Sequence, residues 1–181
     1  MMTKHNFFLK FIRYSFVFSL AIVMLSSCSE DEDPVTPVDE DITFEVQLLK
    51  MQALEIKEAE GDALEVYGNI DTKLIRDNVV ETNSIWRALI GEAISVGLSD
   101  VPVVAAVPYT VKKSQIANSR IEVDVDLFDS DGDPEDNAPE NLGREQTTTN
   151  LSDIATSVTL SIVLADSGGQ HVEVTYSITR K

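Results

Sequence analysis

The chain has 181 residues, of which 43% are hydrophobic and 25% charged, a composition typical of one globular domain with a short appendage. Its formal net charge is −17, from 31 acidic and 14 basic side chains. A surface this acidic repels phosphate backbones and other anions, which argues against nucleic-acid binding and favours cations as partners.

Residues 1–27 have the pattern of a cleavable export signal. Lys4, Lys10 and Arg13 precede an apolar run of twelve residues from Tyr14 to Leu25. A spanning helix needs about 20 apolar residues, so this run is too short for a span and fits a signal peptide.

Cys28 is the only cysteine of the chain, so it cannot form an intramolecular disulfide. The tetrapeptide Leu25-Ser26-Ser27-Cys28 resembles the bacterial lipobox, in which the cysteine is lipidated before the signal is removed. The resemblance implies that Cys28 becomes the first, lipid-bearing residue of the mature protein. Because each buried methylene contributes about 0.8 kcal/mol, several acyl chains anchor a protein firmly without spanning the membrane.

Residues 28–41 predict an extended acidic tether, because a segment of acids and prolines cannot bury apolar surface. The residues directly after the cysteine are Ser29, Glu30, Asp31, Glu32 and Asp33. This run resembles the surface-export signal of lipoproteins in Bacteroidota, which implies display on the outer face of the outer membrane. The alternative is that the run is only a spacer.

Residues 42–181 are expected to form an all-β domain, an antiparallel β-sandwich. Apolar and polar residues alternate in five segments, which are residues 43–48, 64–70, 121–127, 158–164 and 172–178. Residues 165–170 contain Gly168-Gly169 and predict a hairpin between the last two segments.

Residues 83–96 admit two interpretations, a short helix or two short strands, and the β character of the surrounding sequence favours strands. Trp86, within this segment, is expected in the core rather than in a ligand platform. Pro102 and Pro108 are expected near strand edges, where a missing N–H is tolerated.

Carboxylates crowd the segment from Asp124 to Glu140. Such groups repel one another unless a cation neutralises them or the loop points them apart into water. Calcium takes six to eight oxygen ligands in flexible geometry, so we expect a calcium site here. Its expected ligands are Asp129, Asp131, Asp133 and Asp136. The alternative is a solvated acidic loop.

An EF-hand is rejected for this segment, because Pro134 stands where that loop needs glycine and a strand-like sequence precedes it. The strand that runs into Phe128-Asp129-Ser130-Asp131, with Asn141-Leu142-Gly143 after further acids, resembles the third calcium loop of C2-type β-sandwiches. Residues 64–70 likewise resemble an early C2 strand in which an aromatic residue and a glycine precede a loop. The resemblance implies a C2-like fold with calcium, although the chain lacks the basic patch of membrane-docking C2 domains.

The sequence offers little for catalysis. His171 is the one histidine after the signal, and it is expected to be an exposed residue of the final hairpin. No Gly-x-Ser-x-Gly elbow, phosphate loop or His-Glu-x-x-His motif occurs. The expected function is therefore non-catalytic, a binding or adhesion surface for a protein or glycan ligand. The alternative is a glycan-active hydrolase that uses two carboxylates.

Overall fold

The computed structural model describes residues 38–56, 62–130, 140–166 and 169–181. These residues form nine strands with three short 3-10 helices between them. In chain order the strands are β1 (Asp41–Glu55), β2 (Ala63–Arg76), β3 (Val79–Ala88), β4 (Ile94–Gly97), β5 (Val101–Lys112), β6 (Ser119–Asp129), β7 (Glu140–Asn150), β8 (Ser157–Ala165) and β9 (His171–Arg180). The 3-10 helices are η1 (Ile90–Glu92), η2 (Lys113–Asn118) and η3 (Leu151–Asp153).

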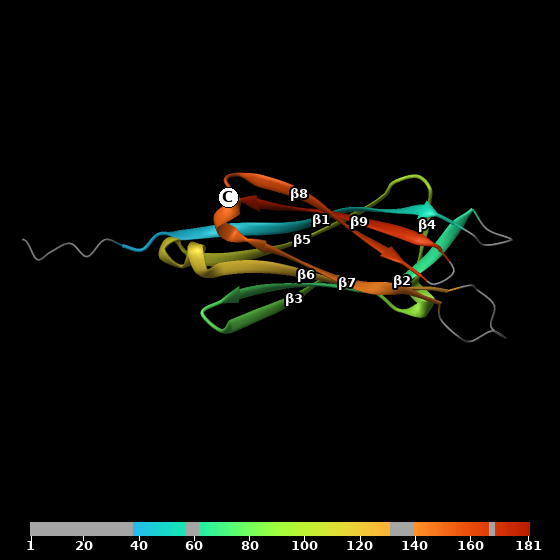
Figure 1. Cartoon of the computed structure of the whole chain (residues 1–181), viewed down its shortest axis with the longest axis horizontal. Coiled ribbons are helices and arrows are strands. Elements are labelled where there is room, and N and C mark those ends of the chain that lie inside the picture. The colour runs from blue at the N-terminus through green and yellow to red at the C-terminus, as the bar shows by residue number, and fades with distance from the viewer. Residues whose placement is uncertain (1–37, 57–61, 131–139, 167–168) are drawn as a thin grey trace, which may run out of the picture. The chain divides into compact units, whose positions relative to one another are not determined.

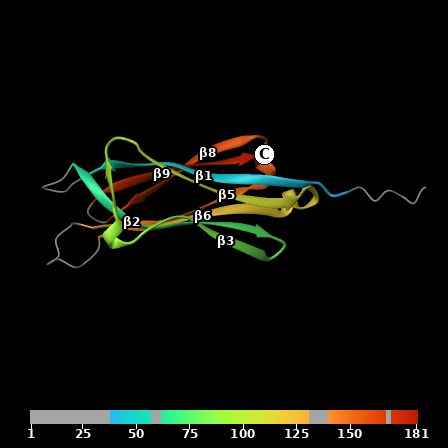
Figure 2. The ribbon, with the colours of Figure 1, turned by 180° about the vertical axis from the view of Figure 1, so that it is seen from behind.

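The strands form two antiparallel sheets that lie face to face as the layers of a sandwich (Figure 1). One sheet has the order β5-β1-β9-β8, and the other has the order β3-β2-β6-β7, with β4 also paired to β2. The view from behind shows the same two layers (Figure 2). The predicted antiparallel β-sandwich is therefore confirmed.

The core lies between the sheets, because one side chain in two along each central strand points inward. Phe44 and Leu48 of β1, Leu127 of β6 and Tyr176 of β9 are fully covered. Burying an apolar side chain of this size contributes roughly 1.5–3 kcal/mol to stability. The alternation in the sequence thus identified the strand faces that pack against the opposite sheet.

Two tyrosine hydroxyls cross the core and hydrogen-bond with the opposite sheet. Tyr109 of β5 donates to the backbone carbonyl of Thr72 on β2 at 2.9 Å, and its oxygen lies 2.6 Å from the Thr72 hydroxyl. Tyr176 of β9 hydrogen-bonds with the hydroxyl of Thr147 on β7. These bonds satisfy polar groups that would otherwise be buried at a cost.

Within residues 83–96, residues 83–88 lie in β3 and residues 94–96 lie in β4, which confirms the interpretation as two short strands. The two strands pair end to end along the same edge of β2, and η1 occupies the gap between them. Trp86 is half-buried against the core, as expected of a packing residue.

Pro102 and Pro108 both lie in β5, at one edge of its sheet. Both prolines therefore fall on an edge strand, where the missing N–H breaks no central ladder.

Candidate functional site

Two of the acidic residues singled out in the sequence, Asp129 and Glu140, lie at one end of the sandwich. β6 ends at Asp129 and β7 begins at Glu140, and these two residues are paired across the strands. Gln170, at the close of the β8–β9 hairpin, donates from its Nε2 to Oε2 of Glu140 at 3.1 Å. Carboxylate and amide oxygens of three strand ends therefore lie at this end of the domain.

Asp129 is the one predicted calcium ligand among the described residues, and only 1% of its surface is exposed. Its Oδ1 accepts a hydrogen bond of 2.7 Å from the backbone N–H of Glu65 on β2. Its Oδ2 is buried and has no hydrogen-bond partner within the described part of the chain, and the same holds for Oε1 of Gln170. Leaving such an oxygen unsatisfied costs about 1–3 kcal/mol, more when the group is charged.

An unpartnered carboxylate oxygen fits a hard cation such as calcium, which prefers oxygen ligands. Over residues 38–56, 62–130, 140–166 and 169–181, however, no three acidic, histidine or cysteine side chains come together in a group that could hold a metal. Asp131, Asp133 and Asp136 lie outside the described residues, as do Cys28 and the run from Ser29 to Asp33. Of the expected ligand set, the structure thus supplies Asp129 alone.

Asp124 belongs to the same acidic segment, but protein cations neutralise it. It lies on the outer face of the β6 sheet and accepts hydrogen bonds from Arg144 at 3.0 and 2.6 Å and from Lys73 at 3.2 Å. The bonds with Arg144 are the main reason that the pKa of Asp124 is lowered. The charge of Asp124 is therefore neutralised without a metal ion. Carboxylate repulsion favours calcium only at the end of β6, around Asp129.

A second candidate site is an open groove on the outer face of the same sheet, with a volume of about 530 Å³. Along this edge of β2, β3 pairs with the strand from Gly68 onward and β4 pairs with it only up to Val66. The groove lies at the unpaired position between them, next to Tyr67. The residues that line this groove are Tyr67, Gly68, Asn69, Arg87, Ala88, Leu89, Ile90 and Phe128. The side chains of Leu89 and Ile90 are 62% and 60% exposed.

Tyr67 of β2 and Phe128 of β6 stack in the groove, with ring centroids 5.4 Å apart and ring planes 24° apart. They are direct partners in the strand register. Partial burial, and then the negative charge of Asp129, raise the pKa of the Tyr67 hydroxyl. The hydroxyl therefore stays protonated at neutral pH and can donate a hydrogen bond.

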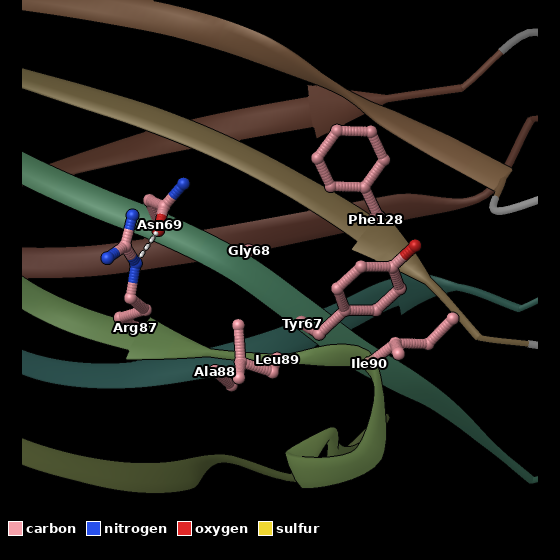
Figure 3. A pocket seen from close by; sticks show the side chains of 8 residues that line it. All are labelled: Tyr67, Gly68, Asn69, Arg87, Ala88, Leu89, Ile90 and Phe128. Carbon is pink, nitrogen blue, oxygen red and sulfur yellow. Dashed lines mark hydrogen bonds between the residues drawn. The ribbon is translucent and has the colours of Figure 1, made fainter.

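Arg87 of β3 lies opposite Asn69 of β2 and donates from Nε to Oδ1 of Asn69 at 2.7 Å. Figure 3 shows this polar pair on one side of Gly68, with Tyr67 and Ile90 on the other. The groove thus combines an aromatic wall with a positioned polar pair.

Gly68 allows the backbones of β2 and β6 to approach each other closely beneath the groove. Its φ is +131°, and a Cβ placed on it would lie 2.2 Å from the backbone oxygen of Asp126 on β6. A side chain here would push β2 and β6 apart beneath the groove.

From the sequence, Tyr67 and Gly68 stood out as the aromatic residue and the glycine of residues 64–70, but the grouping of Arg87, Asn69 and Phe128 was not predicted. The available signal was the position of Phe128, which continues the polar phase of Asp124 and Asp126 along β6. A contiguous apolar patch on the solvent face of a sheet indicates a binding surface, and Phe128 forms such a patch together with Tyr67. What the sequence could not provide was the strand register, which places Phe128 opposite Tyr67 and Arg87 opposite Asn69.

His171 begins β9, and its Nδ1 lies 3.4 Å from Oε2 of Glu55 on β1. Its side chain is 36% exposed. A half-exposed imidazole beside a carboxylate of the neighbouring strand is an ordinary surface contact.

No protein-family model matches this chain, and no curated protein matches it. Several solved structures are similar to this chain over part of their fold. A C2 domain of plant extended synaptotagmin 1 matches with a TM-score of 0.40 at 10% identity, covering 77% of this chain and 94% of that domain. The pair of C2 domains of extended synaptotagmin 2, solved with calcium bound, matches with a TM-score of 0.40 at 11% identity, covering 77% of this chain and 45% of the other.

A human GIVD cytosolic phospholipase A2 also matches, with a TM-score of 0.39 at 10% identity. The match covers 78% of this chain, which spans only 18% of the phospholipase chain. At this level of similarity, neither ligands nor activities transfer to the present protein.

Within the described residues, no helix is both long and apolar enough to cross a membrane.

Proposed function

We propose that the mature protein is a lipid-anchored, non-catalytic binding module of the bacterial outer membrane, displayed on the cell surface, whose acidic end binds calcium. The anchor rests on Cys28 and the signal before it, and the surface address rests on the acidic run after it. Asp41 already belongs to β1, and Asp39 and Glu40 hydrogen-bond with η2. The tether that gives the sandwich reach from the membrane is therefore the shorter segment 28–38.

The observation that carries the calcium proposal is the carboxylate of Asp129. This side chain is buried, one of its oxygens is committed to the N–H of Glu65, and the other has no partner among the described residues. A cation that used Oδ2 would satisfy the oxygen and offset the cost of burying the charge. Asp131, Asp133 and Asp136 follow at short intervals in the sequence and complete the proposed ligand set.

Calcium suits this set better than magnesium. It accepts six to eight oxygens at flexible angles, whereas magnesium requires near-octahedral geometry and releases its waters reluctantly. An ion that binds only the folded state stabilises that state by mass action, by about 2.7 kcal/mol at a hundredfold excess over its dissociation constant.

The experiment is a thermal unfolding series on the full chain, as the cell processes it, with calcium, magnesium or chelator. Saturating calcium should raise the melting temperature by about 5–10 °C, since each kcal/mol is worth roughly 2–4 °C in a domain of this size. Magnesium should have a much smaller effect. If the two ions act alike and weakly, the acidic loop is only solvated and the calcium proposal is wrong.

A further inference from the structure

The groove around Tyr67 is a site without an assigned ligand. We propose that it binds a neutral saccharide, one sugar unit of which packs against the Tyr67–Phe128 wall. This inference rests on the proposal that the protein is a binding module, but it does not depend on calcium.

The aromatic wall suits the apolar face of a sugar ring. Tyr67 and Phe128 lie side by side at paired positions of two neighbouring strands, so the backbone fixes both rings. An aromatic face carries partial negative charge and attracts the polarised C–H groups that a pyranose presents on one side. Because the rings are held in place before binding, little side-chain entropy is lost when the ligand arrives.

The polar pair suits the hydroxyl groups of the same ring. Nε of Arg87 is used by Asn69, and over the described residues the Nη atoms of Arg87 form no ion pair or hydrogen bond. The side-chain amide of Asn69 adds two donors. Two planar groups locked to each other present donors in a fixed arrangement, which is what recognition of neighbouring hydroxyls requires.

Charge favours a neutral ligand over an acidic one. The net charge of the chain is −17, so an anionic polymer is repelled as it approaches. Two carboxylates lie on the same sheet face as Asn69. Asp126 is its direct partner on β6, and Asp71 is two positions further along β2. A neutral sugar meets no such repulsion and still uses the hydroxyl donors.

The test measures binding of purified full chain to soluble hexasaccharides of β-linked glucose, β-linked xylose, β-linked mannose and α-linked glucose. Polygalacturonate and hyaluronan serve as acidic comparisons. Tyr67→Ala removes the wall, and Arg87→Ala removes the exposed cation while leaving the packing of the sheet intact. Val80→Ala is the matched control, because Val80 is 55% exposed on β3, seven positions before Arg87.

At least one neutral hexasaccharide should bind, and both groove variants should weaken its binding by about tenfold or more, the effect of losing one good contact. Val80→Ala should bind like the parent protein, and the melting temperature of Arg87→Ala should be unchanged. Binding of acidic glycans alone, or neutral binding that survives both groove variants, would overturn the inference.

The two proposals fail separately. If no saccharide binds but calcium still stabilises the same preparation, the groove inference is wrong and the calcium proposal stands. If a hexasaccharide binds and is shortened during incubation, as chromatography would reveal, the non-catalytic assignment is wrong. If a hexasaccharide binds intact while calcium has no effect, the groove is supported and the calcium site is rejected.

Discussion

Arg144 on β7 and Asp124 on β6 form a two-pronged ion pair on the outer face of the sandwich, with Nε at 3.0 Å from Oδ1 and Nη2 at 2.6 Å from Oδ2. Lys73 of β2 adds a third contact at 3.2 Å from the other side. Asp124 is only 7% exposed, whereas the side chain of Arg144 is 65% exposed. The pair therefore ties three neighbouring strands together at one carboxylate.

Asp124→Asn should lower the free energy of unfolding at pH 7 by about 1–2 kcal/mol, between the values for exposed and buried pairs. The hydrogen bonds with Arg144 hold the folded-state pKa of Asp124 below its ordinary value of 3.8. Its stabilisation is therefore complete above pH 3.8 and is lost as the pH falls through the lowered folded-state pKa. The difference between parent and variant in urea unfolding should shrink accordingly.

The control for this prediction is Asp100→Asn, which breaks an ion pair of 2.7 Å with Lys50 at a position where Asp100 is 56% exposed. It should change stability by less than about 0.5 kcal/mol. Equal losses in the two variants, or an Asp124 effect that persists unchanged in acid, would show that the pair does not act as described.

Gly68→Ala should destabilise the domain by more than about 2 kcal/mol, since the new Cβ would lie 2.2 Å from the Asp126 oxygen and the backbone has a φ of +131°. Gly91→Ala is the matched control, because a Cβ on Gly91 meets nothing within 4 Å. It should change stability by less than about 0.5 kcal/mol. Urea unfolding of both variants checks the contrast, and similar stabilities would disprove the close approach of β2 and β6.

Cys28→Ser should abolish incorporation of a radiolabelled fatty acid, because the chain has no other cysteine to acylate. The variant should accumulate as an uncleaved precursor or a soluble form. Labelling followed by electrophoresis measures both effects. Acylation that survives the substitution would rule out the lipoprotein assignment.

Replacing Glu30, Asp31, Glu32 and Asp33 with alanine should leave lipidation intact but remove the protein from the protease-accessible cell surface. A variant in which aspartates and glutamates are interchanged keeps the charge and should remain displayed. Protease shaving of intact cells, with fatty-acid labelling alongside, distinguishes the outcomes. If the alanine variant is digested as readily as the parent, the acidic run is only a spacer.

Strict alternation made much of the fold predictable from sequence. Segments 43–48, 64–70, 121–127, 158–164 and 172–178 all fall inside strands, and the hairpin at residues 165–170 joins β8 to β9. The prediction stopped at Leu48 because a bulge between Leu48 and Lys50 shifts the phase of β1, so that Met51 and Ala53 become the inward residues. A one-residue shift of this kind divides the alternation into two shorter runs of opposite phase, and the second run is too short to be recognised from sequence.

β7 was not predicted, because its sequence is polar almost throughout and buries only Leu142. It is an edge strand whose place is set by pairing with β6 and by contacts such as Thr147 with Tyr176. The groove could not be predicted either, because its residues come from separate strands. Tyr67 and Phe128 are 61 positions apart in the sequence, and only the register of β2 against β6 brings them together.

Titration calorimetry of the full chain with calcium measures whether the acidic end binds the ion through Asp129 and the acids after it. We expect saturable binding at millimolar concentration or below, lost when both Asp129 and Asp131 are replaced by asparagine. Asp153→Asn, on η3 at the far end of β7, is the control and should bind as the parent does. Absence of saturable binding in the parent, or an unaltered titration in the Asp129→Asn, Asp131→Asn double variant, would show that calcium does not bind at this end of the domain.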